Sequence, residues 1–509
     1  MSNLTATIRM MNEMCHVIVD MEYHGIGISI PGLEKLKAEY KERLDQLEVE
    51  IEELILCATG RNEVNMDSPQ QLSELIYSRG VIDKEEWKRV FNLGAEERGG
   101  VSKPKRRHRY TNAQFVKIVR TLTEVLPRFT IKQCPLCLGE GKEEFYIGEK
   151  KRKRPCATCE GRGFQRISTG KVSGFKVVPE QEDVSVGGFS TSGDTLEKLS
   201  KKVEGDAKQF LTKMVERNKI SHYLDTFIAG IEKNTGADGV LHPKFHQTIA
   251  ATARLSSTDP NFHNQPRGTT FPIRRVVISK FNGGKLLEGD FKQLEFRAAA
   301  ELSGCRQALK DIQDGIDIHK VTASIIGCNR QDAKEHTFKP LYGGTTGTDK
   351  ERAYYAHFAK HYLGITNWHQ NLIDTVLRCG ILTLPTGREY RFTGVKRYPS
   401  GAVSFSTQIK NYPVQGFATA DIVPVVAIEC HKFLIKKGMQ SHIINEIHDS
   451  IVIDCHPNEI EECVSILEVC MSSVHQLMKE RYGFGMTVPI EAEYKIGDNW
   501  LDMKEIKGL

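Results

Sequence analysis

Two aspartates occupy positions from which a carboxylate could take part in chemistry. Asp290 follows an apolar run that starts at Lys285, and Asp449 lies between two further apolar runs. A lone aspartate ahead of a helical pattern is more often a helix cap than a catalyst, so the evidence for chemistry is the pair. Mg²⁺ binds one or two protein carboxylates together with substrate phosphates. The pair therefore indicates two Mg²⁺ ions and phosphoryl transfer, in which one ion activates the attacking hydroxyl and both stabilise the leaving oxygen.

A second set of residues has the chemistry of a triphosphate site. The set recurs every fourth residue and consists of Arg330, Lys334, Phe338 and Tyr342. On a helix this spacing forms one ridge. Two cations followed by two rings suit a nucleoside triphosphate, with its phosphates at the cations and its sugar and base at the rings. Without further evidence, a helix with surface salt bridges and a core-facing aromatic edge explains the same pattern.

The stretch 252–264 is rich in hydrogen-bond donors and has no regular periodicity. Segments of this kind often position phosphates or sugars, and Arg254 would be the natural phosphate ligand. A hydrogen-bonded structural loop is the alternative, and the segment alone does not decide between the two.

Regular elements must hold these side chains in place. The apolar run that leads to Asp290 predicts a strand, and the helical spacing after it predicts a helix, so Asp290 should lie at the tip of the strand, facing a cleft. The runs on either side of Asp449 predict two strands joined by a tight turn that presents His448 and Asp449. Apolar periodicity predicts further helices over residues 33–54, 196–210 and 210–231.

Four cysteines form the strongest local motif in the chain. They occur as two Cys-x-x-Cys pairs, Cys134 with Cys137 and Cys156 with Cys159, and each pair continues into Gly-x-Gly. Four thiolates suit a closed tetrahedral Zn²⁺ site, and glycines allow the tight backbone turns that such a site needs. A closed site has no open position for a substrate, so the zinc should be structural. The duplication makes a redox function of the cysteines the minor alternative.

Two basic runs accompany the cysteines, over residues 103–109 and 150–154. Lysine and arginine clusters bind nucleic-acid phosphates or dock acidic partners. A solvated charged surface is the other interpretation, and all three stay open.

Length and composition limit the possible classes. A chain of 509 residues should fold into two to four domains or lobes. With a net charge of only +5, any nucleic-acid surface must come from local basic clusters. No apolar run is long enough to span a membrane, and the N-terminus lacks the pattern of a signal peptide. The thirteen cysteines are therefore expected to be reduced, in the cytoplasm of a bacterium or of a bacterial host cell.

The ordered motifs resemble those of family A DNA polymerases, the bacterial DNA polymerase I class with its phage relatives. The matching stretches are Arg254-Leu255-Ser256-Ser257 with Asp259-Pro260-Asn261, Asp290-Phe291-x-Gln293-x-Glu295-x-Arg297 (motif A), Arg330-x₃-Lys334-x₃-Phe338-x₃-Tyr342-Gly343 (motif B), Asn411-x-Pro413-x-Gln415-Gly416, and His448-Asp449 (motif C). The resemblance extends over almost the whole chain except the cysteine-bearing segment. Agreement in both order and spacing makes the resemblance highly specific.

The resemblance implies a function for individual residues. Asp290, Asp449 and the backbone carbonyl of Phe291 would hold two Mg²⁺ ions, and Lys334 would protonate the pyrophosphate leaving group, which makes it catalytic with the two aspartates. The residues implied to bind the incoming nucleotide are Gln293, Glu295, His319, Arg330, Lys334, Phe338 and Tyr342. Glu295 resembles a steric gate that excludes a ribose 2′-hydroxyl. The residues implied to contact template or primer are Arg254, Asn264, Gln415 and His448.

The resemblance also implies an α+β right-hand fold with an antiparallel-sheet palm, helical fingers, a helical thumb and a zinc-ribbon insertion in the thumb. The expected boundaries are 1–84 and 179–250 for the thumb, 85–178 for the insertion, 251–309 and 401–509 for the palm, and 310–400 for the fingers. Pro340 lacks an N–H and should bend or shorten the last turn of the fingers helix before Tyr342.

Several residues depart from the family pattern. Ser450 stands where the cellular enzymes usually have glutamate, Ala253 replaces a common glycine, and Thr407 replaces a template-contacting arginine. The sequence His-Asp-Ser also occurs in single-subunit phage RNA polymerases, which are therefore the closest alternative. Glu295 argues against them, because those enzymes lack a carboxylate gate.

The predicted function is DNA-templated 5′→3′ DNA synthesis from a primer with dNTPs by a two-metal-ion mechanism, in phage genome replication. No intrinsic exonuclease is expected, because Asp20-Met21-Glu22 lacks room upstream for a nuclease domain. The alternatives are an RNA polymerase-like enzyme and a non-catalytic DNA-binding subunit. Expected partners are template–primer DNA and dNTPs, with a processivity factor, a helicase or a separate exonuclease subunit as further candidates, and no membrane. The insertion would raise processivity by gripping duplex DNA or docking a partner.

Overall fold

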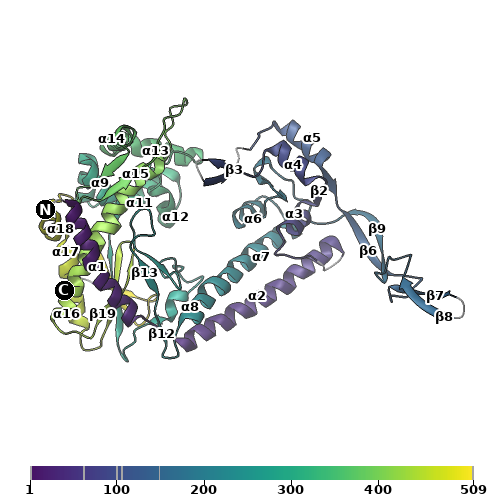
Figure 1. Cartoon of the computed structure of the whole chain (residues 1–509), viewed down its shortest axis with the longest axis horizontal. Helices are drawn as coiled ribbons and strands as arrows, with labels where there is room; N and C mark the ends of the chain where they lie inside the picture. The colour runs from purple at the N-terminus through teal and green to yellow at the C-terminus, as the bar shows by residue number, and fades with distance from the viewer. Residues whose placement is uncertain (1–2, 61–63, 99–100, 105–106, 148–149, 507–509) are drawn as a thin grey trace. The chain divides into compact units, whose positions relative to one another are not determined.

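The computed structural model describes residues 3–60, 64–98, 101–104, 107–147 and 150–506. By internal contacts the chain forms two compact units, one made of residues 1–36 and 226–509 and the other of residues 37–225. Helices and strands are mixed in both units (Figure 1). Among the described residues, no helix has both the length and the apolar content that a membrane crossing requires.

A five-stranded sheet forms the centre of the first unit. Its strands are antiparallel and lie in the order β19 (His442–Ile447), β20 (Ser450–Cys455), β16 (Lys285–Phe291), β21 (Ala492–Gly497) and β22 (Lys504–Ile506). The strand before Asp290 and the two strands around Asp449 are therefore confirmed. Strands β19 and β20 are buried along their whole length, and polar residues such as Asn445, Glu446 and Asp454 are buried with the apolar ones.

Helices cover this sheet. The helices in contact with it are α1 (Asn3–His24), α16 (Val423–Lys436) and α17 (Ile460–Ser472), and α18 (Val474–Tyr482) packs on these three helices. Helix α17 approaches β16 so closely that a Cβ on Gly289 would lie 2.5 Å from Met471 Sδ, so the absence of a side chain at this position allows the close packing. Helix α1 packs on α16 and β19 (Figure 1). Residues 3–24 thus pack with the sheet, whereas the sequence prediction grouped them with residues 25–84.

A helical region lies between β16 and β19 in the chain. It comprises α9 (Leu294–Ser303), α10 (Arg306–Gln313), α11 (Ile318–Ile326), α12 (Arg330–Thr337), α13 (Asp349–His361), α14 (Leu363–Cys379), the hairpin β17 (Ile381–Thr383) and β18 (Glu389–Arg391), α15 (Ser406–Gln415), and the π-helical turn η4 (Gly416–Ile422) that leads into α16. Helix α9 follows β16 after a turn at Gln293, which adopts the left-handed conformation with φ 50°.

The predicted effect of Pro340 is confirmed. Helix α12 ends at Thr337, and the chain continues as turns in which Tyr342 N–H donates to Phe338 C=O at 3.2 Å. One expectation changes as a result. Only Arg330 and Lys334 lie on this helix, so the four residues of motif B do not form one helical ridge, because the chain leaves the helix before the proline.

Shorter elements complete the first unit. They are α8 (Ala229–Asn234), the three-stranded sheet β12 (Val240–Leu241), β1 (Ile26–Ile28) and β15 (Val277–Ile278), the pair β13 (Lys244–His246) and β14 (Ser256–Thr258), and the 3₁₀ turn η3 (Ile273–Val276).

Two long helices, α2 (Ile30–Thr59) and α7 (Gly205–His222), lie side by side in the second unit (Figure 1). Ion pairs join them, including Arg43 Nε to Glu216 Oε1 at 2.8 Å and Lys213 Nζ to Glu50 Oε2 at 2.6 Å. The helix predicted over residues 33–54 lies within α2 and is confirmed.

The continuous helix predicted over residues 196–210 is wrong. Helix α6 (Gly193–Ser200) ends before α7 begins, because Glu204 is extended and Gly205 adopts a left-handed φ of 62°. The helix predicted over residues 210–231 is nearly right, since α7 continues through the π-helical turn η2 (Tyr223–Ile228) into α8.

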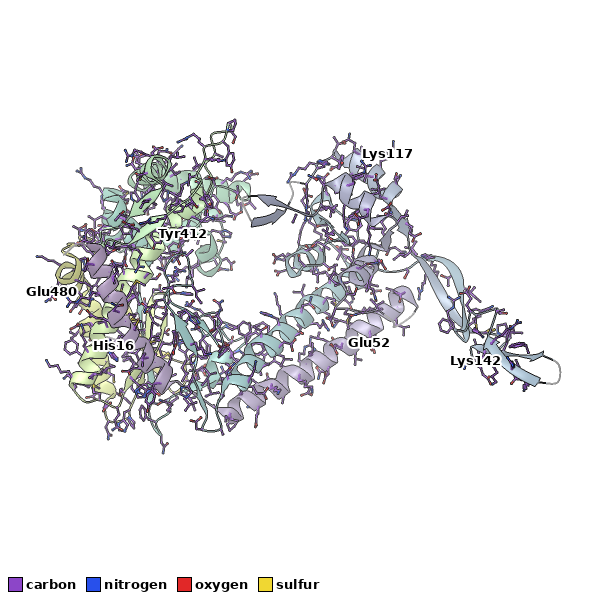
Figure 2. The ribbon with its side chains drawn as sticks, in the orientation of Figure 1. His16, Glu52, Lys117, Lys142, Tyr412 and Glu480 are labelled. Atoms are coloured by element: carbon purple, nitrogen blue, oxygen red, sulfur yellow. The ribbon has the colours of Figure 1, made fainter. Side chains whose placement is uncertain are left out.

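The rest of the second unit is a small core with a long arm. The core contains α3 (Pro69–Tyr77), β2 (Arg79–Val81), α4 (Lys84–Phe91), the hairpin β3 (Ala95–Arg98) and β4 (Val101–Pro104), α5 (Asn112–Leu122), β5 (Thr123–Val125), η1 (Gln181–Asp183), β10 (Val184–Ser185) and β11 (Gly188–Phe189). The arm consists of two successive two-stranded ladders, β6 (Pro127–Gln133) with β9 (Phe164–Val172), and β7 (Lys142–Ile147) with β8 (Lys150–Pro155) (Figure 1). Figure 2 shows Lys142, at the start of β7.

A buried carboxyl in β19 should make the stability of the sheet depend on pH. Glu446 is 1% exposed and its Oε2 has no hydrogen-bond partner among the described residues. Burial raises the pKa of Glu446 to about 8, from the ordinary value of 4.5. The folded protein therefore keeps this proton between these pH values while the unfolded chain loses it, so the stability that it contributes is complete below pH 4.5 and is lost as the pH rises to about 8.

The variant Glu446→Gln, which imitates the neutral acid, is expected to raise Tm above that of the wild type by about 3 °C or more at pH 8. At pH 5 the two proteins should unfold at the same temperature. Differential scanning calorimetry would measure both. Glu461→Gln, at an exposed carboxyl on α17, should have no such effect. If Glu446→Gln lowered Tm equally at both pH values, Glu446 would not be a neutral acid in the folded protein.

Candidate active site

Asp290 and Asp449 face one cavity. Asp290 is the penultimate residue of β16, and Asp449 lies in the two-residue turn between β19 and β20, where His448 adopts a left-handed φ of 58°. The N–H of Phe291 donates to the C=O of Asp449 at 3.0 Å, which ties the strand end to the turn. Both aspartates line a cavity of about 480 Å³. The structure therefore brings together the two residues that the sequence singled out.

The electrostatics of this pair favour a bound cation. Burial raises the pKa of Asp290, and the negative charges of Asp449 and Glu288 raise it further. Burial also raises the pKa of Asp449, against the opposing effect of Arg267. In the part of the chain that the structure describes, neither carboxylate forms an ion pair with a lysine or arginine. Two adjacent carboxylates without a partner cation, with oxygen as their only donor atom, fit Mg²⁺.

Most of the expected nucleotide-binding residues line the same cavity. They are Gln293, Glu295, His319, Arg330, Lys334 and Phe338. Further charged residues line it that the sequence analysis missed, namely Arg267, Lys292, Asp317, Glu491 and Glu493. The alternation Glu-x-Glu at the start of β21 could have indicated the last two. Arg267 lies in an irregular segment, where no periodic pattern distinguishes it.

The cationic side of the cavity comes from α12 and its neighbour. Arg330 Nε donates to Asp317 Oδ2 at 2.7 Å, and Asp317 also accepts the N–H of His319 at 2.9 Å as the cap of α11. Lys334 is exposed and forms no ion pair with any described residue. The two cations are therefore unequal, because Arg330 must leave a carboxylate to bind a phosphate whereas Lys334 is free to bind.

His319 is not a third cation. Burial lowers the pKa of His319 to about 4, so the ring is neutral at physiological pH. Its Nδ1 lies 3.0 Å from Thr337 Oγ1, and the ring packs edge-on against Phe338 with the centroids 5.3 Å apart. A neutral imidazole in this position can donate one hydrogen bond from Nε2 when Nδ1 accepts from the threonine.

Glu295 is the centre of a polar network. The guanidinium of Arg254 and the hydroxyl of Tyr342 both donate to its carboxylate, and Arg254 Nε also donates to Thr419 Oγ1 at 3.1 Å. Gln415 is hydrogen-bonded to Tyr342, while burial and the charge of Glu295 raise the pKa of Tyr342. Tyr342 does not itself line the cavity. It is connected to the site by its hydrogen bond to Glu295, which does line it.

The expected DNA-contacting residues are less closely gathered. Arg254 and Gln415 belong to the network around Glu295, and His448 adjoins Asp449. Burial lowers the pKa of His448 to about 4, so this ring is also neutral. Asn264 is exposed and does not line the cavity. The structure therefore groups three of these four residues near the aspartates.

Asp20 and Glu22 have structural partners. Asp20 Oδ2 lies 2.5 Å from His431 Nε2 on α16, and Glu22 Oε1 accepts the N–H of Phe245 at 2.7 Å. Both carboxylates therefore help to join α1 to its neighbours.

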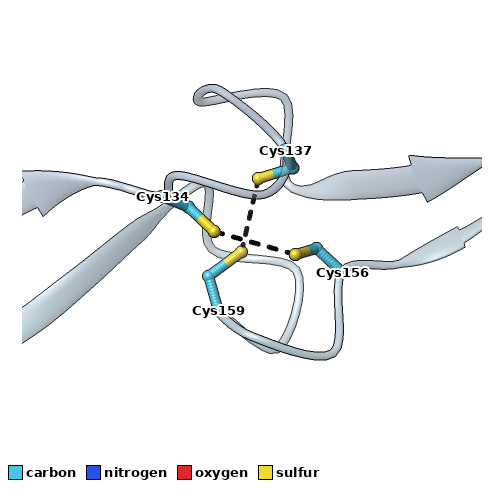
Figure 3. Close-up of side chains that lie close together, drawn as sticks. All are labelled: Cys134, Cys137, Cys156 and Cys159. Atoms are coloured by element: carbon cyan, nitrogen blue, oxygen red, sulfur yellow. Dashed lines mark hydrogen bonds between the residues drawn. The ribbon is translucent and has the colours of Figure 1, made fainter.

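The four cysteines of the motif meet between the two ladders of the arm. Their sulfur atoms lie within 4.8 Å of one another, with Cys134 and Cys156 3.8 Å apart and Cys137 and Cys159 3.6 Å apart (Figure 3). These separations are far too long for a disulfide bond of about 2.05 Å. A tetrahedron of sulfurs around zinc, with bonds of about 2.3 Å, has edges of about 3.8 Å.

The surrounding backbone is built for this cluster. Gly141 N–H donates to Cys137 Sγ at 3.3 Å, and Gly163 N–H donates to Cys159 Sγ at 3.2 Å. Both glycines have positive φ, and a Cβ on Gly141 would lie 2.3 Å from the C=O of Gly161. The Gly-x-Gly sequences thus allow the two turns that carry the cysteine pairs to approach each other closely.

The second basic run is partly neutralised within the arm. Strand β8 carries this run beside the glutamates of β7, and Arg154 Nε donates to Glu143 Oε1 at 2.6 Å. Lys151 pairs with Glu144, and Lys153 Nζ lies 3.4 Å from Glu140 Oε2. Most of the run is therefore less available to phosphates than its sequence indicated. In the first run, residues 105–106 lie outside the described residues, as do the side chains of residues 103–104.

Comparisons with known sequences agree on one family. The family model described as DNA polymerase family A matches residues 171–502. DNA polymerase I of Streptococcus pneumoniae is 26% identical over 341 residues, which cover 62% of this chain and 37% of that protein. The thermostable DNA polymerase I of Thermus aquaticus is 28% identical over 341 residues, which cover 62% of this chain and 38% of that protein. The matched region is thus little more than a third of the length of these relatives.

Among solved structures, the chain is similar to the POL domain of Pol1 from M. smegmatis, in a complex with DNA primer-template and dNTP. The TM-score is 0.64 and the identity 18%, over 96% of this chain and 70% of that chain. At this identity the likeness establishes the fold, a mixed arrangement of helices and sheet.

Proposed function

Because the chain belongs to DNA polymerase family A, we propose that it is a DNA-templated DNA polymerase that extends a primer 5′→3′ with dNTPs. One observation carries this proposal. Asp290 and Asp449 line the same cavity as Arg330 and Lys334, so a divalent-cation site and a phosphate site share one space. A site of this composition suits transfer of a nucleotidyl group from a triphosphate to a primer hydroxyl.

The residues divide the work of the proposed reaction. Asp290, Asp449 and the carbonyl of Phe291 would hold two Mg²⁺ ions, which supply Lewis-acid stabilisation of the attacking and leaving oxygens. Arg330 would exchange its contact with Asp317 for the phosphates. Lys334, which has no such contact to break, would bind the phosphates and give a proton to the leaving pyrophosphate. His319 and Phe338, already packed together, would form the wall along the triphosphate and sugar.

The network around Glu295 supports selection of the sugar. Arg254 and Tyr342 both hold its carboxylate, so Glu295 has little freedom to move away from a bulky substrate. A ribose 2′-hydroxyl would meet this side chain, whereas a deoxyribose would fit. This favours a DNA polymerase over the RNA polymerase-like alternative. In the same proposal, Arg254, Asn264, Gln415 and His448 contact the template–primer.

The finer architecture is part of the proposal. Residues 251–309 and 401–509 would form the palm, which contains the antiparallel sheet, and residues 310–400 the fingers, which contain α11 and α12. The thumb, predicted as residues 1–84 and 179–250 with the insertion at 85–178, would begin after residue 24, because residues 3–24 pack with the palm sheet. Phage genome replication is the proposed setting, with a processivity factor, a helicase or a separate exonuclease subunit as candidate partners.

We propose that the four cysteines hold one structural Zn²⁺ and that the arm raises processivity. The sulfur separations fit zinc, and the cluster joins the two ladders of the arm. The partial neutralisation of β8 favours docking of a partner over gripping of duplex DNA, because fewer free cations remain for phosphates.

Primer extension with separate nucleotides tests the proposed function. With Mg²⁺ and a defined template–primer, the wild type should extend with dNTPs and reject rNTPs. Glu295→Ala removes the bulk of the gate and should raise the ratio of rNTP to dNTP incorporation, measured as kcat/KM, by about 10–100-fold.

Glu295→Gln is the matched control, because glutamine keeps the volume of the gate and should keep most of the selection. A wild type that preferred rNTPs would establish the RNA polymerase alternative. A wild type that incorporated neither nucleotide would indicate the non-catalytic subunit. If Gln relaxed selection as much as Ala, the charge of Glu295 would decide selection instead of its bulk.

Metal analysis tests the proposed zinc site. Purified wild type should contain one zinc per chain by atomic emission, and Cys156→Ser should lose it, because three thiolates leave the site open. The variant should also make shorter products per binding event in the presence of trap DNA. Cys379→Ser, at an exposed cysteine outside the arm, should change neither quantity. Loss of zinc with unchanged product length would contradict the proposed function of the arm.

A further inference from the structure

A third carboxylate lies next to Asp290 and is not explained by the reaction described above. Glu288 precedes Asp290 by two residues on β16, so both side chains emerge from the same face of the strand. Ser450 Oγ donates to Glu288 Oε1 at 3.1 Å, and Trp500 Nε1 donates to the same oxygen at 3.5 Å. These two donors come from different segments, which fixes the carboxylate relative to the sheet.

The register of the sheet places Glu288 and its donor directly around Asp290. Ser450 is paired with Asp290 across the β16–β20 ladder. The hydroxyl of Ser450 therefore lies opposite Asp290 and donates a diagonal hydrogen bond to Glu288. On the other side of β16, Glu493 is paired with Asp290 and Lys495 with Glu288.

No cation neutralises Glu288 directly. It forms no ion pair with any residue that the structure describes, including the cross-strand neighbour Lys495. Arg274 stacks on the indole of Trp500, with its guanidinium carbon 3.8 Å from the ring centroid, and donates instead to the C=O of Gln265 at 3.4 Å. Glu288 therefore shares one face of β16 with Asp290, and Arg274 acts on both carboxylates through its charge without an ion pair to either.

We propose that Glu288, held by Ser450 and Trp500, is a positioning residue that provides a third negative charge at the catalytic centre and strengthens cation binding by Asp290 and Asp449. This inference rests on the proposed function, since it concerns the same metal site. A carboxylate two residues along a strand is about 7 Å away at the backbone, within the distance at which charges in a partly buried site interact strongly. A second carboxylate beside a metal ligand raises the affinity for a cation without contacting it.

A purely structural function of Glu288 predicts a different outcome. As an acceptor for Ser450 and Trp500, a glutamine would serve nearly as well, because its amide oxygen accepts the same two hydrogen bonds. The charge would be lost. Glu288→Gln thus separates the hydrogen bonds from the charge. The register also offers a rescue, because a carboxylate introduced by Ser450→Glu would stand opposite Asp290 on the same face of the sheet.

Manganese binding to the whole chain, without nucleotide or DNA, tests the proposal. Free Mn²⁺ would be followed by electron paramagnetic resonance during titration of the wild type, Glu288→Gln, and Glu288→Gln with Ser450→Glu. We expect the single variant to bind Mn²⁺ about tenfold more weakly. The double variant should recover to within about threefold of the wild type. Glu461→Gln, at an exposed carboxyl on α17, should bind as the wild type does.

In primer extension, kcat should be lower in Glu288→Gln than in the wild type and should be restored in the double variant. KM for dNTP should change little in either variant. Unchanged Mn²⁺ affinity in Glu288→Gln would overturn the proposal. So would a weakened affinity that Ser450→Glu failed to restore, because the charge would then not be the cause.

A second variant covers the case in which Glu288→Gln does not fold. Ser450→Ala keeps the carboxylate and removes one of its donors, so it should weaken Mn²⁺ binding by a smaller factor, about threefold. Unchanged binding in this variant would overturn the proposal. Failure of the proposed function is distinguishable, because it would appear as absence of templated incorporation by the wild type, whatever its affinity for Mn²⁺.

Discussion

The hydrogen bond from Phe291 N–H to Asp449 C=O is the contact on which the site depends. It extends the antiparallel ladder between β16 and β20 into the turn that carries Asp449, and this ladder brings together two carboxylates from distant parts of the chain. Burial raises the pKa of both aspartates, and the nearby charges of Asp449 and Glu288 raise that of Asp290 further, so holding two carboxylates here is costly. The fold tolerates the repulsion because the sheet is fixed by buried strands and by α17 packed on Gly289. A divalent cation would relieve it.

The rest of the site is arranged around this unfavourable pair. Arg330 and Lys334, both on α12, line the same cavity as the two aspartates. Arg330 donates a hydrogen bond to Asp317, whereas Lys334 forms no ion pair with any residue that the structure describes. His319 and His448 are both neutral, so neither adds charge, and His319 is hydrogen-bonded to Thr337. The carboxylate of Glu295 accepts hydrogen bonds from Arg254 and Tyr342. These contacts fix the position of the side chain, and Arg254 balances its charge. In the proposed function, carboxylates would hold the metal ions, the cations of α12 the phosphates, and Glu295 would lie beside the sugar.

The extent to which sequence predicts this molecule follows from the range of each interaction. Apolar runs around Asp449 predicted its strands and turn, and cysteine spacing predicted the sulfur cluster, because both patterns are local. Pro340 predicted the early end of α12 for the same reason. The break before α7 was missed, since apolar spacing continues across Glu204 and Gly205. The partners of Glu295 and the entry of Arg267 into the cavity depend on tertiary packing between remote segments. Charge pairing in the arm was also hidden, because it requires the register of β7 with β8.

The central claim is that Asp290 and Asp449 act as one unit. Single-turnover primer extension with Mg²⁺, by the wild type, Asp290→Asn, Asp449→Asn and the double variant, tests it most directly. Residues that act together have non-additive effects. Each single substitution should therefore slow extension by about 10³-fold or more, roughly 4 kcal/mol of transition-state stabilisation, and the double variant should be at most about tenfold slower than either. Extension that survived both substitutions, or a double variant slowed by the full product of the two single effects, would contradict this account.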